Sequence, residues 1–222
     1  MNLSIAITDK GLLREANEDK VFADDNHGVY AVADGVGSAS EGAMASEIIC
    51  RNLKIVLAAA PNDFGRLLSL VERSLIDADL AIRSYRDMKG YKEMASTVAV
   101  LVLDPKNPRH VAICHVGDSR VYRISHGMPE VLTRDHRLTK EDTLLLRAVG
   151  SGKELKTDWI EIDGEGPANY VLCTDGVHEV VSPARLAVYA AAPNLESAAE
   201  RLKAEVLRRG APDNFSFVIV KT

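Results

Sequence analysis

Long apolar runs, basic clusters and cysteines are all scarce in this sequence of 222 residues. No run approaches the roughly 18 apolar residues of a membrane span, and the first residues do not lead from a basic segment into an apolar one. We therefore expect neither a membrane-spanning helix nor a signal peptide. The absence of any run of lysine and arginine also argues against a nucleic-acid partner.

The three cysteines, Cys50, Cys114 and Cys173, all stand in apolar surroundings. An odd number of buried thiols favours free cysteines in a reducing compartment over disulfides, so we expect a cytoplasmic protein. The overall composition is ordinary for a globular domain, because 46% of the residues are hydrophobic and 27% are charged. The net charge of −5 is small, but the motifs below bring part of the acidic excess together.

Hydrophobic patterning predicts a series of strands and two pairs of helices. The strands are expected at Leu3–Ile7, Val21–Ala23, Val29–Ala33, Thr97–Leu103, His110–Val116, Arg120–Ile124, Leu155–Ile162, Tyr170–Thr174 and Phe215–Val220. Ser38 and Asp63 are candidate N-caps of the first helix pair, and the stretch from Ser38 to Glu41 matches a capping box. Ser182 and Asn194 would cap the second pair.

The order of these elements indicates the fold class. Short turns separate the strands between Thr97 and Ile124, which predicts an antiparallel meander. Segregated helix pairs and tight hairpins favour an α+β domain over a parallel βαβ array. Two antiparallel sheets packed face to face would bury both helix pairs on their outer faces, as a four-layer αββα sandwich. We see no repeat or low-complexity linker, so residues 1–222 are expected to form a single domain.

Four short segments place a carboxylate at or beside the end of a predicted strand: Arg14–Asp19, Asp34-Gly35, Asp175-Gly176 and Asp213-Asn214. An Asp-Gly pair alone predicts a turn. Asp163-Gly164 fits that reading, because it follows an alternating strand, and we expect a hairpin turn there. Asp34 and Asp175 instead follow nearly continuous apolar strands that should be buried on both faces. A charge there is costly unless it is paired or bound to metal.

Carboxylates without a cluster of histidine or cysteine are typical ligands of hard cations such as magnesium or manganese. Two such ions about 3.5–4 Å apart can share a water molecule and lower its pKa, which would allow attack on phosphorus. Arg14 stands four residues before Glu18 in the sequence. Its planar guanidinium fork makes it the candidate for holding phosphate oxygens. The alternative is that Arg14 is an ordinary surface arginine.

Taken in order along the chain, these motifs resemble those of metal-dependent protein phosphatases of type 2C, in their compact bacterial form. The resembling stretches are Arg14–Asp19, Val32–Gly37, Ser96–Ala99, His115–Arg123, Leu132–His136, Arg147–Gly150, Leu172–Gly176 and Asp213–Ser216. The resemblance covers nearly the whole chain. It implies a sandwich of two antiparallel sheets flanked by helix pairs, which agrees with the fold expected above.

The resemblance also implies a set of metal ligands. Asp34 would bridge two manganese or magnesium ions and take part in catalysis, and the carbonyl of Gly35 would be a further ligand. Glu18 would bind one ion, and Asp175 and Asp213 would bind the other.

Other implied roles lie around this centre. Arg14 would bind the substrate phosphate, and Asp118 together with Asp175 would bind a third, weaker ion. From its own residues, the stretch Gly117–Arg120 is also typical of a hairpin turn, so Asp118 has a structural alternative.

Two residues would support the ligands: Asp19 would hold a metal-bound water, and Asn214 would orient the loop that carries the neighbouring aspartate. The histidines near these motifs are expected to be structural, namely His115, His136 and His178.

The sequence departs from the family pattern at two places. Many eukaryotic relatives carry a histidine, thought to be a general acid, where this chain has Val36. No side chain at that position can donate a proton, so a metal-bound water would have to protonate the leaving oxygen. Many bacterial relatives also have a longer flap where this chain has only residues 135–147, and the shortened flap puts substrate selectivity inferred from relatives in doubt.

The implied function is hydrolysis of phosphoserine or phosphothreonine on proteins. The enzyme would act as a monomer and would reverse phosphorylation by a bacterial Ser/Thr kinase. A first alternative is a pseudophosphatase, a binding module for phosphoproteins that has lost catalysis, but such a module should have lost metal carboxylates that are all present here. A second alternative is a hydrolase of small phosphoesters, which the short flap favours slightly. A third is a phosphatase acting in a partner-switching pathway on an anti-sigma-factor antagonist.

Overall fold

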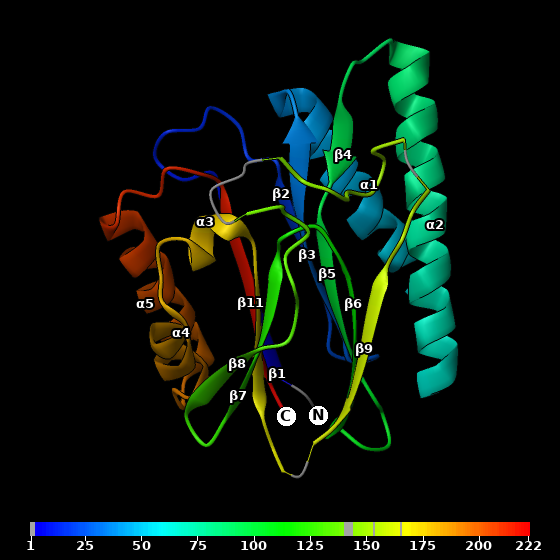
Figure 1. Ribbon diagram of the computed structural model, residues 1–222. Coiled ribbons are helices and arrows are strands. Elements are labelled where there is room, and N and C mark those ends of the chain that lie inside the picture. The colour runs from blue at the N-terminus through cyan, green and yellow to red at the C-terminus, as the bar shows by residue number, and fades with distance from the viewer. Residues whose placement is uncertain (1–2, 140–143, 153, 165) are drawn as a thin grey trace.

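The computed structural model describes residues 3–139, 144–152, 154–164 and 166–222 (Figure 1). Two antiparallel sheets lie face to face, and helices cover the outer face of each sheet. One sheet has the order β1, β11, β10, β7, β8, formed by Leu3–Asp9, Phe215–Lys221, Asn169–Cys173, Arg120–Ser125 and Met128–Val131. The other has the order β2, β3, β5, β6, β9, formed by Asp19–Asp24, Val29–Gly37, Val98–Leu103, His110–Val116 and Asp158–Asp163. The short strand β4 (Met94–Ser96) extends the second sheet beside the end of β3.

Helices α1 (Ala39–Leu57) and α2 (Phe64–Lys89) pack on the sheet that contains β3. Helices α4 (Pro183–Ala190) and α5 (Leu195–Arg208) pack on the sheet that contains β11, close to the single-turn helix α3 (Asp175–His178). A third apolar cluster fills the space between the two sheets. The α+β class and the four-layer arrangement predicted from the sequence are therefore confirmed.

Strand β3 shows why its sequence is apolar at every position. Val29, Ala31 and Ala33 face the helices, whereas Tyr30 and Val32 face the opposite sheet. All five side chains are fully buried, as expected for a strand with packing on both faces. The side chains that follow at the end of this strand are therefore held against a rigid core.

Ser38, Asp63, Ser182 and Asn194 all stand at the N-cap positions predicted for them, but the Ser182 side chain makes no cap hydrogen bond. The Asp63 side chain accepts a hydrogen bond from the Arg66 N–H at 3.0 Å, and the Asn194 side chain accepts one from the Ser197 N–H at 2.7 Å. At α1 the Ser38 N–H donates to the Glu41 side chain at 3.1 Å, which is one half of a capping box. The cysteines are buried and free, and no helix in the described part of the chain is long and apolar enough to cross a membrane.

The predicted meander between Thr97 and Ile124 is wrong in its second half. Strands β5 and β6 pair as an antiparallel hairpin, but β7 leaves that sheet and pairs with β10 and β8 in the other one. The chain passes from one sheet to the other at Gly117. Its φ of +107° is accessible to glycine but strained for other residues. A Cβ atom at Gly117 would also lie only 2.6 Å from Cβ of Thr97. The turn therefore links the two sheets and is not a hairpin.

The hairpin turn predicted at Asp163-Gly164 is wrong for the same reason. Strand β9 ends at Asp163 and pairs with β6, whereas the next strand, β10, lies in the opposite sheet. Gly164 donates its N–H to the carbonyl of Arg109 at 2.9 Å as the chain leaves the sheet. Patterning identified the strands on both sides of this turn, but it did not identify their partners.

Candidate active site

Asp34 lies near the end of β3, where its backbone is fixed on both sides. Its N–H donates to the Thr97 hydroxyl at 3.1 Å, and its carbonyl accepts from the Thr97 N–H at 2.8 Å and from the Ser96 hydroxyl at 2.9 Å. Thr97 in turn shares a hydrogen bond of 2.7 Å with the hydroxyl of Ser119, at the crossing between the sheets. With its backbone held in this way, the Asp34 carboxylate is directed into a pocket at the end of the sandwich.

Asn214 holds the loop that carries Glu18. Its amide nitrogen donates to the carbonyls of Lys10 and Ala16 at 2.9 and 2.8 Å, and its oxygen accepts from the Glu18 N–H at 2.9 Å. The adjacent Asp213 enters the same pocket. Asn214 therefore joins two acidic segments that lie 196 residues apart in the sequence.

Asp175 enters the pocket from the other sheet, at the first turn of α3. The next residue, Gly176, is packed so closely that a Cβ atom would lie 2.0 Å from the carbonyl oxygen of Asn214. Gly35 and Gly42 form a similar contact, since a Cβ on Gly35 would lie 2.1 Å from the carbonyl oxygen of Gly42. A Cβ on Gly42 would lie 2.1 Å from Oε2 of Glu18. These glycines let the acid-bearing segments approach one another closely. A glycine that served only to form a turn would not need so close an approach.

Asp19 differs from the other predicted site residues because it does not line the pocket. It stands opposite Asp34 in the pairing of β2 with β3 and is fully buried. One oxygen accepts a hydrogen bond from the Thr174 hydroxyl at 2.8 Å, and the other, Oδ1, has no hydrogen-bond partner.

The pocket has a volume of about 290 Å³ and is strongly acidic. It is lined by Arg14, Glu18, Asp34, Gly35, Val36, Gly37, Thr97, Asp118, Arg137, Leu145, Asp175, Glu179, Asp213 and Asn214. Folding has thus brought together every predicted site residue except Asp19. The lining contains six carboxylates but only two guanidinium groups, those of Arg14 and Arg137.

The electrostatics of this cluster reflect burial and mutual repulsion. Burial raises the pKa of Asp34 well above its ordinary value, and the neighbouring carboxylates of Asp19 and Asp175 raise it further. Burial also raises the pKa of Asp175 to about 6, with Asp118 the next cause, and that of Asp19 to about 7. Within the described part of the chain, the Oδ1 atom of Asp175 is buried without a hydrogen-bond partner. Crowded oxygen donors that outnumber the positive charges around them fit a hard divalent cation.

Arg14 lies at the rim of the pocket. Its Nη2 atom contacts Oδ2 of Asp213 at 2.7 Å, and half of its side chain is exposed. The arginine is therefore paired inside the acidic cluster while remaining accessible to a ligand from solvent.

A buried network fixes the crossing that carries Asp118. The Gly117 N–H donates to Nδ1 of His136 at 3.1 Å, so the ring proton of a neutral His136 lies on Nε2, which is 3.0 Å from Asp158. His178 contacts the carbonyl of Asp118 at 3.1 Å through Nε2. Burial lowers the pKa of His178 to about 4, which keeps the ring neutral. Both histidines thus support the backbone behind the pocket.

Arg137 is a residue of the pocket that sequence reasoning missed. Arg137 falls within the shortened flap of residues 135–147, of which residues 140–143 lie outside the described part of the chain. Arg137 and Leu145 form an isolated antiparallel bridge, and the Arg137 side chain reaches Asp118, Asp175 and Glu179. No local pattern could have revealed a contact that joins residues 38 positions apart.

Comparison with known proteins shows the family to which this chain belongs. The sequence model described as "Protein phosphatase 2C" matches residues 14–210. The chain belongs to the protein phosphatase 2C family. This confirms the resemblance recognised in the sequence motifs.

The relatives within the protein phosphatase 2C family include solved structures. The chain is 28% identical to the serine/threonine protein phosphatase PstP of Mycobacterium tuberculosis, over 96% of this chain and 44% of that protein, so it spans less than half of PstP. It superposes on PppA, a regulatory component of T6SS in Pseudomonas aeruginosa, with a TM-score of 0.91, 25% identity and coverage of 99% and 97%. It also superposes on the catalytic domain of PstP in complex with two manganese ions, with a TM-score of 0.87, 27% identity and the same coverage.

Proposed function

We propose that this chain is a metal-dependent protein phosphatase that hydrolyses phosphoserine or phosphothreonine on proteins. The observation that carries the proposal is the convergence of six carboxylates beside Arg14, with one oxygen of Asp175 buried and without a hydrogen-bond partner. Membership of the protein phosphatase 2C family supports the same reaction. The retention of every acidic ligand position disfavours a binding module that has lost catalysis.

Two manganese or magnesium ions would be held by Glu18, Asp34, the carbonyl of Gly35, Asp175 and Asp213. The catalytic domain of PstP, which shares this fold, was solved with two manganese ions. When bound, such ions supply Lewis-acid activation of water and neutralise charge on the phosphate. The protein itself would hold the carboxylates rigidly. Asp19 stands opposite Asp34 in the pairing of β2 with β3, and Asn214, next to Asp213, accepts a hydrogen bond from the Glu18 N–H.

Arg14 would bind and orient the phosphate of the substrate. Its fork offers two parallel N–H donors to two phosphate oxygens, a geometry that lysine cannot match. In the absence of substrate it pairs with Asp213, and a dianionic phosphate would draw it toward the pocket centre.

The proton for the leaving serine or threonine oxygen would come from water. Among the described residues that line the pocket, none carries an imidazole, ammonium, phenol or thiol group. Val36 stands where many eukaryotic relatives have a histidine, and 37% of its surface is exposed. A water-dependent proton supply is consistent with an open site.

The substrates would be phosphoproteins, and the partner system would be a Ser/Thr kinase whose phosphorylation this enzyme reverses. We expect it to act as a monomer in the cytoplasm, as a single catalytic domain over residues 1–222. The shortened flap near residues 135–147 would leave the pocket accessible to a phosphorylated loop of a folded protein.

The direct test is phosphate release from a phosphothreonine peptide with manganese, with a chelator, and with Asp175→Asn. We expect release that depends on manganese and that both the chelator and the substitution abolish, because Asp175 offers the unpartnered oxygen to the metal. A folded protein that binds the phosphopeptide but releases no phosphate with manganese or magnesium would overturn the enzymatic proposal in favour of a binding module.

Manganese should stabilise the fold more strongly as the pH rises. At a hundredfold excess over its dissociation constant, one bound ion would add about 2.7 kcal/mol to the free energy of unfolding. The raised pKa values of Asp175 (about 6) and Asp19 (about 7) mean that the metal-free fold retains protons that the unfolded chain has released. Their stabilising effect is present below about pH 4 and is lost as the pH rises through 6 and 7. Metal and protons compete for these groups.

This dependence can be measured by thermal melts with manganese and with chelator between about pH 5.5 and 7.5. Titration of His178 is the same in both series and cancels from the difference. A manganese-induced rise in Tm that stays constant or shrinks over this range would contradict ligation by the acidic cluster.

A further inference from the structure

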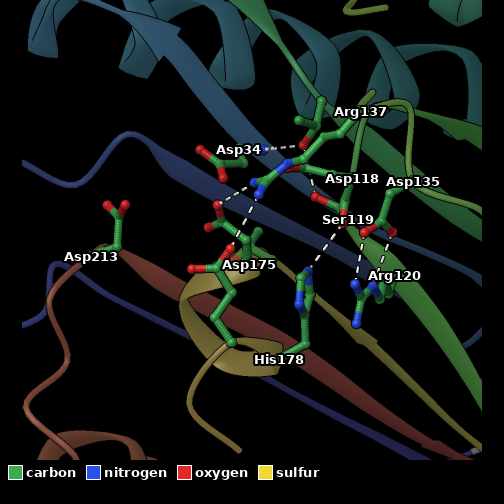
Figure 2. Close-up of polar contacts among 12 residues, drawn as sticks. Asp34, Asp118, Ser119, Arg120, Asp135, Arg137, Asp175, His178 and Asp213 are labelled. Carbon is green, nitrogen blue, oxygen red and sulfur yellow. Dashed lines mark hydrogen bonds and ion pairs between the residues drawn. The ribbon is translucent and has the colours of Figure 1, made fainter. Parts of the chain in front are cut away.

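The guanidinium group of Arg137 lies at the point where a third cation was expected. Its Nη2 atom forms ion pairs with Oδ2 of Asp118 and, at 2.9 Å, with Oδ2 of Asp175 (Figure 2). Its Nη1 atom contacts Oε1 of Glu179 at 3.2 Å. A single nitrogen thus bridges the two carboxylates, and only 11% of the Arg137 side chain is exposed.

The three acids that surround Arg137 are held by rigid elements. Asp118 lies at the crossing between the sheets, and its carbonyl is fixed by His178. Asp175 begins α3, and Glu179 caps the C-terminal end of the same helix. The acids therefore form a fixed receptor for one cation, and the guanidinium fills it.

The residues just before Arg137 fix the position of its backbone. Asp135 forms a bidentate ion pair with Arg120, with distances of 2.9 and 2.7 Å. His136 donates its N–H to the Gly117 carbonyl at 2.8 Å and is held through its ring by Asp158. Because both preceding residues are anchored, the backbone of Arg137 is already positioned, and the freedom lost on entering the receptor is that of its side chain.

Asp175 uses its two oxygens differently. Oδ2 pairs with Arg137, whereas Oδ1 is buried without a hydrogen-bond partner among the described residues, and Asp175 lines the pocket together with Asp34 and Asp213. The pairing with Arg137 therefore leaves Asp175 able to bind an ion of the main centre. Arg137 also occupies Oδ2 of Asp118, the other carboxylate that was expected to bind a third ion.

We propose that Arg137 is a tethered cation that replaces the third metal ion, so that this chain binds two divalent ions and excludes a third. The inference rests on the proposed function, because it concerns the metal content of that same site. Because Arg137 contacts Oδ2 of both Asp118 and Asp175, a divalent ion would have to displace it to use those two atoms. The tethered charge is always present, so occupancy of this position does not depend on the metal concentration.

The test is the number of manganese ions bound per chain, measured by equilibrium dialysis against saturating manganese chloride followed by metal analysis. We expect two ions in the unaltered chain and three in Arg137→Ala, because Asp118 becomes available. The double variant Asp118→Asn/Arg137→Ala should return to two. Arg147→Ala is the matched control: it removes an arginine of the same segment that pairs with Asp158 at 2.6 Å outside the receptor, and it should leave the count at two.

Circular dichroism would check that each variant is folded, and Arg137→Gln, which keeps most of the side-chain volume, serves if Arg137→Ala is not. Three ions in the unaltered chain, or no gain in either Arg137 variant, would overturn the role of Arg137 while leaving the two-ion phosphatase intact. An unaltered chain that binds no manganese would overturn the proposed function as well, so the two failures are distinguishable.

Discussion

Replacing Asp34 with asparagine should lower manganese-dependent phosphate release by about a thousandfold, equivalent to roughly 4 kcal/mol of lost transition-state stabilisation. Asp34 is the residue around which the other carboxylates gather, and its backbone is fixed by Ser96 and Thr97. Asparagine has nearly the same shape but lacks the negative charge. The measurement is kcat/KM for a phosphothreonine peptide at saturating manganese.

The same substitution should not destabilise the metal-free protein. Burial and the nearby carboxylates raise the pKa of Asp34, so its charged form opposes folding, and a neutral amide removes that cost. Melting in chelator should therefore give a Tm for Asp34→Asn at or above that of the unaltered chain. A large fall in Tm would mean that the activity was lost through unfolding.

Asp163→Asn is the matched control, because it makes the same change in an Asp-Gly pair that lies outside the pocket lining. Asp163 is exposed at the end of β9 and does not line the pocket. Activity within about twofold of the unaltered chain is expected for this variant. Equal losses in Asp34→Asn and Asp163→Asn would refute the assignment of the centre to the pocket.

The second large effect is expected at Arg14. Arg14→Ala should lower kcat/KM about 10- to 100-fold, because hydrogen bonds to charged groups contribute about 1.5–3 kcal/mol. Arg14→Lys should recover only part of the loss, since lysine keeps the charge but not the bidentate fork. If Arg14 binds the ground-state phosphate, the loss will fall mainly on KM, measured with the same phosphopeptide.

Arg73→Ala provides the comparison for Arg14. Arg73 pairs with Asp77 on the exposed face of α2 at 2.9 Å, so its removal also breaks an arginine–aspartate pair, but one far from the pocket lining. Unchanged kinetics are expected for this variant. Unchanged kinetics for Arg14→Ala as well would show that Arg14 is only a surface arginine, the alternative that its sequence context left open.

The active-site geometry depends on packing two sheets, because neither sheet carries the whole acidic cluster. Glu18 and Asp34 belong to one side, at β2 and β3, while Asp175 and Asp213 flank β10 and β11 of the other. The two sets are joined by the hydrogen bond that the Glu18 N–H donates to Asn214 and by the one that the Thr174 hydroxyl donates to Asp19. A core substitution that shifted one sheet relative to the other would therefore move the two sets of carboxylates apart. Metal binding would be affected even while the core stays buried.

Much of this protein was determined by local sequence. The continuous apolar run Val29–Ala33 required burial on both faces, and the caps at Asp63 and Asn194 placed helix starts. These features follow from side-chain periodicity and from hydrogen bonds between residues a few positions apart, which a single sequence displays directly. The order of the acidic motifs likewise indicated the family before any geometry was known.

Only the tertiary structure decided which strands are neighbours and which cation meets Asp118. The sequence showed strands on both sides of Gly117, but their partners lie in different sheets, and pairing across a sandwich leaves no local pattern. In the sequence Arg137 is one residue of a shortened flap, and only folding places it between Asp118 and Asp175. Both outcomes depend on contacts between distant segments, whose energies come from packing and charge in three dimensions and not from the residues next to them in the chain.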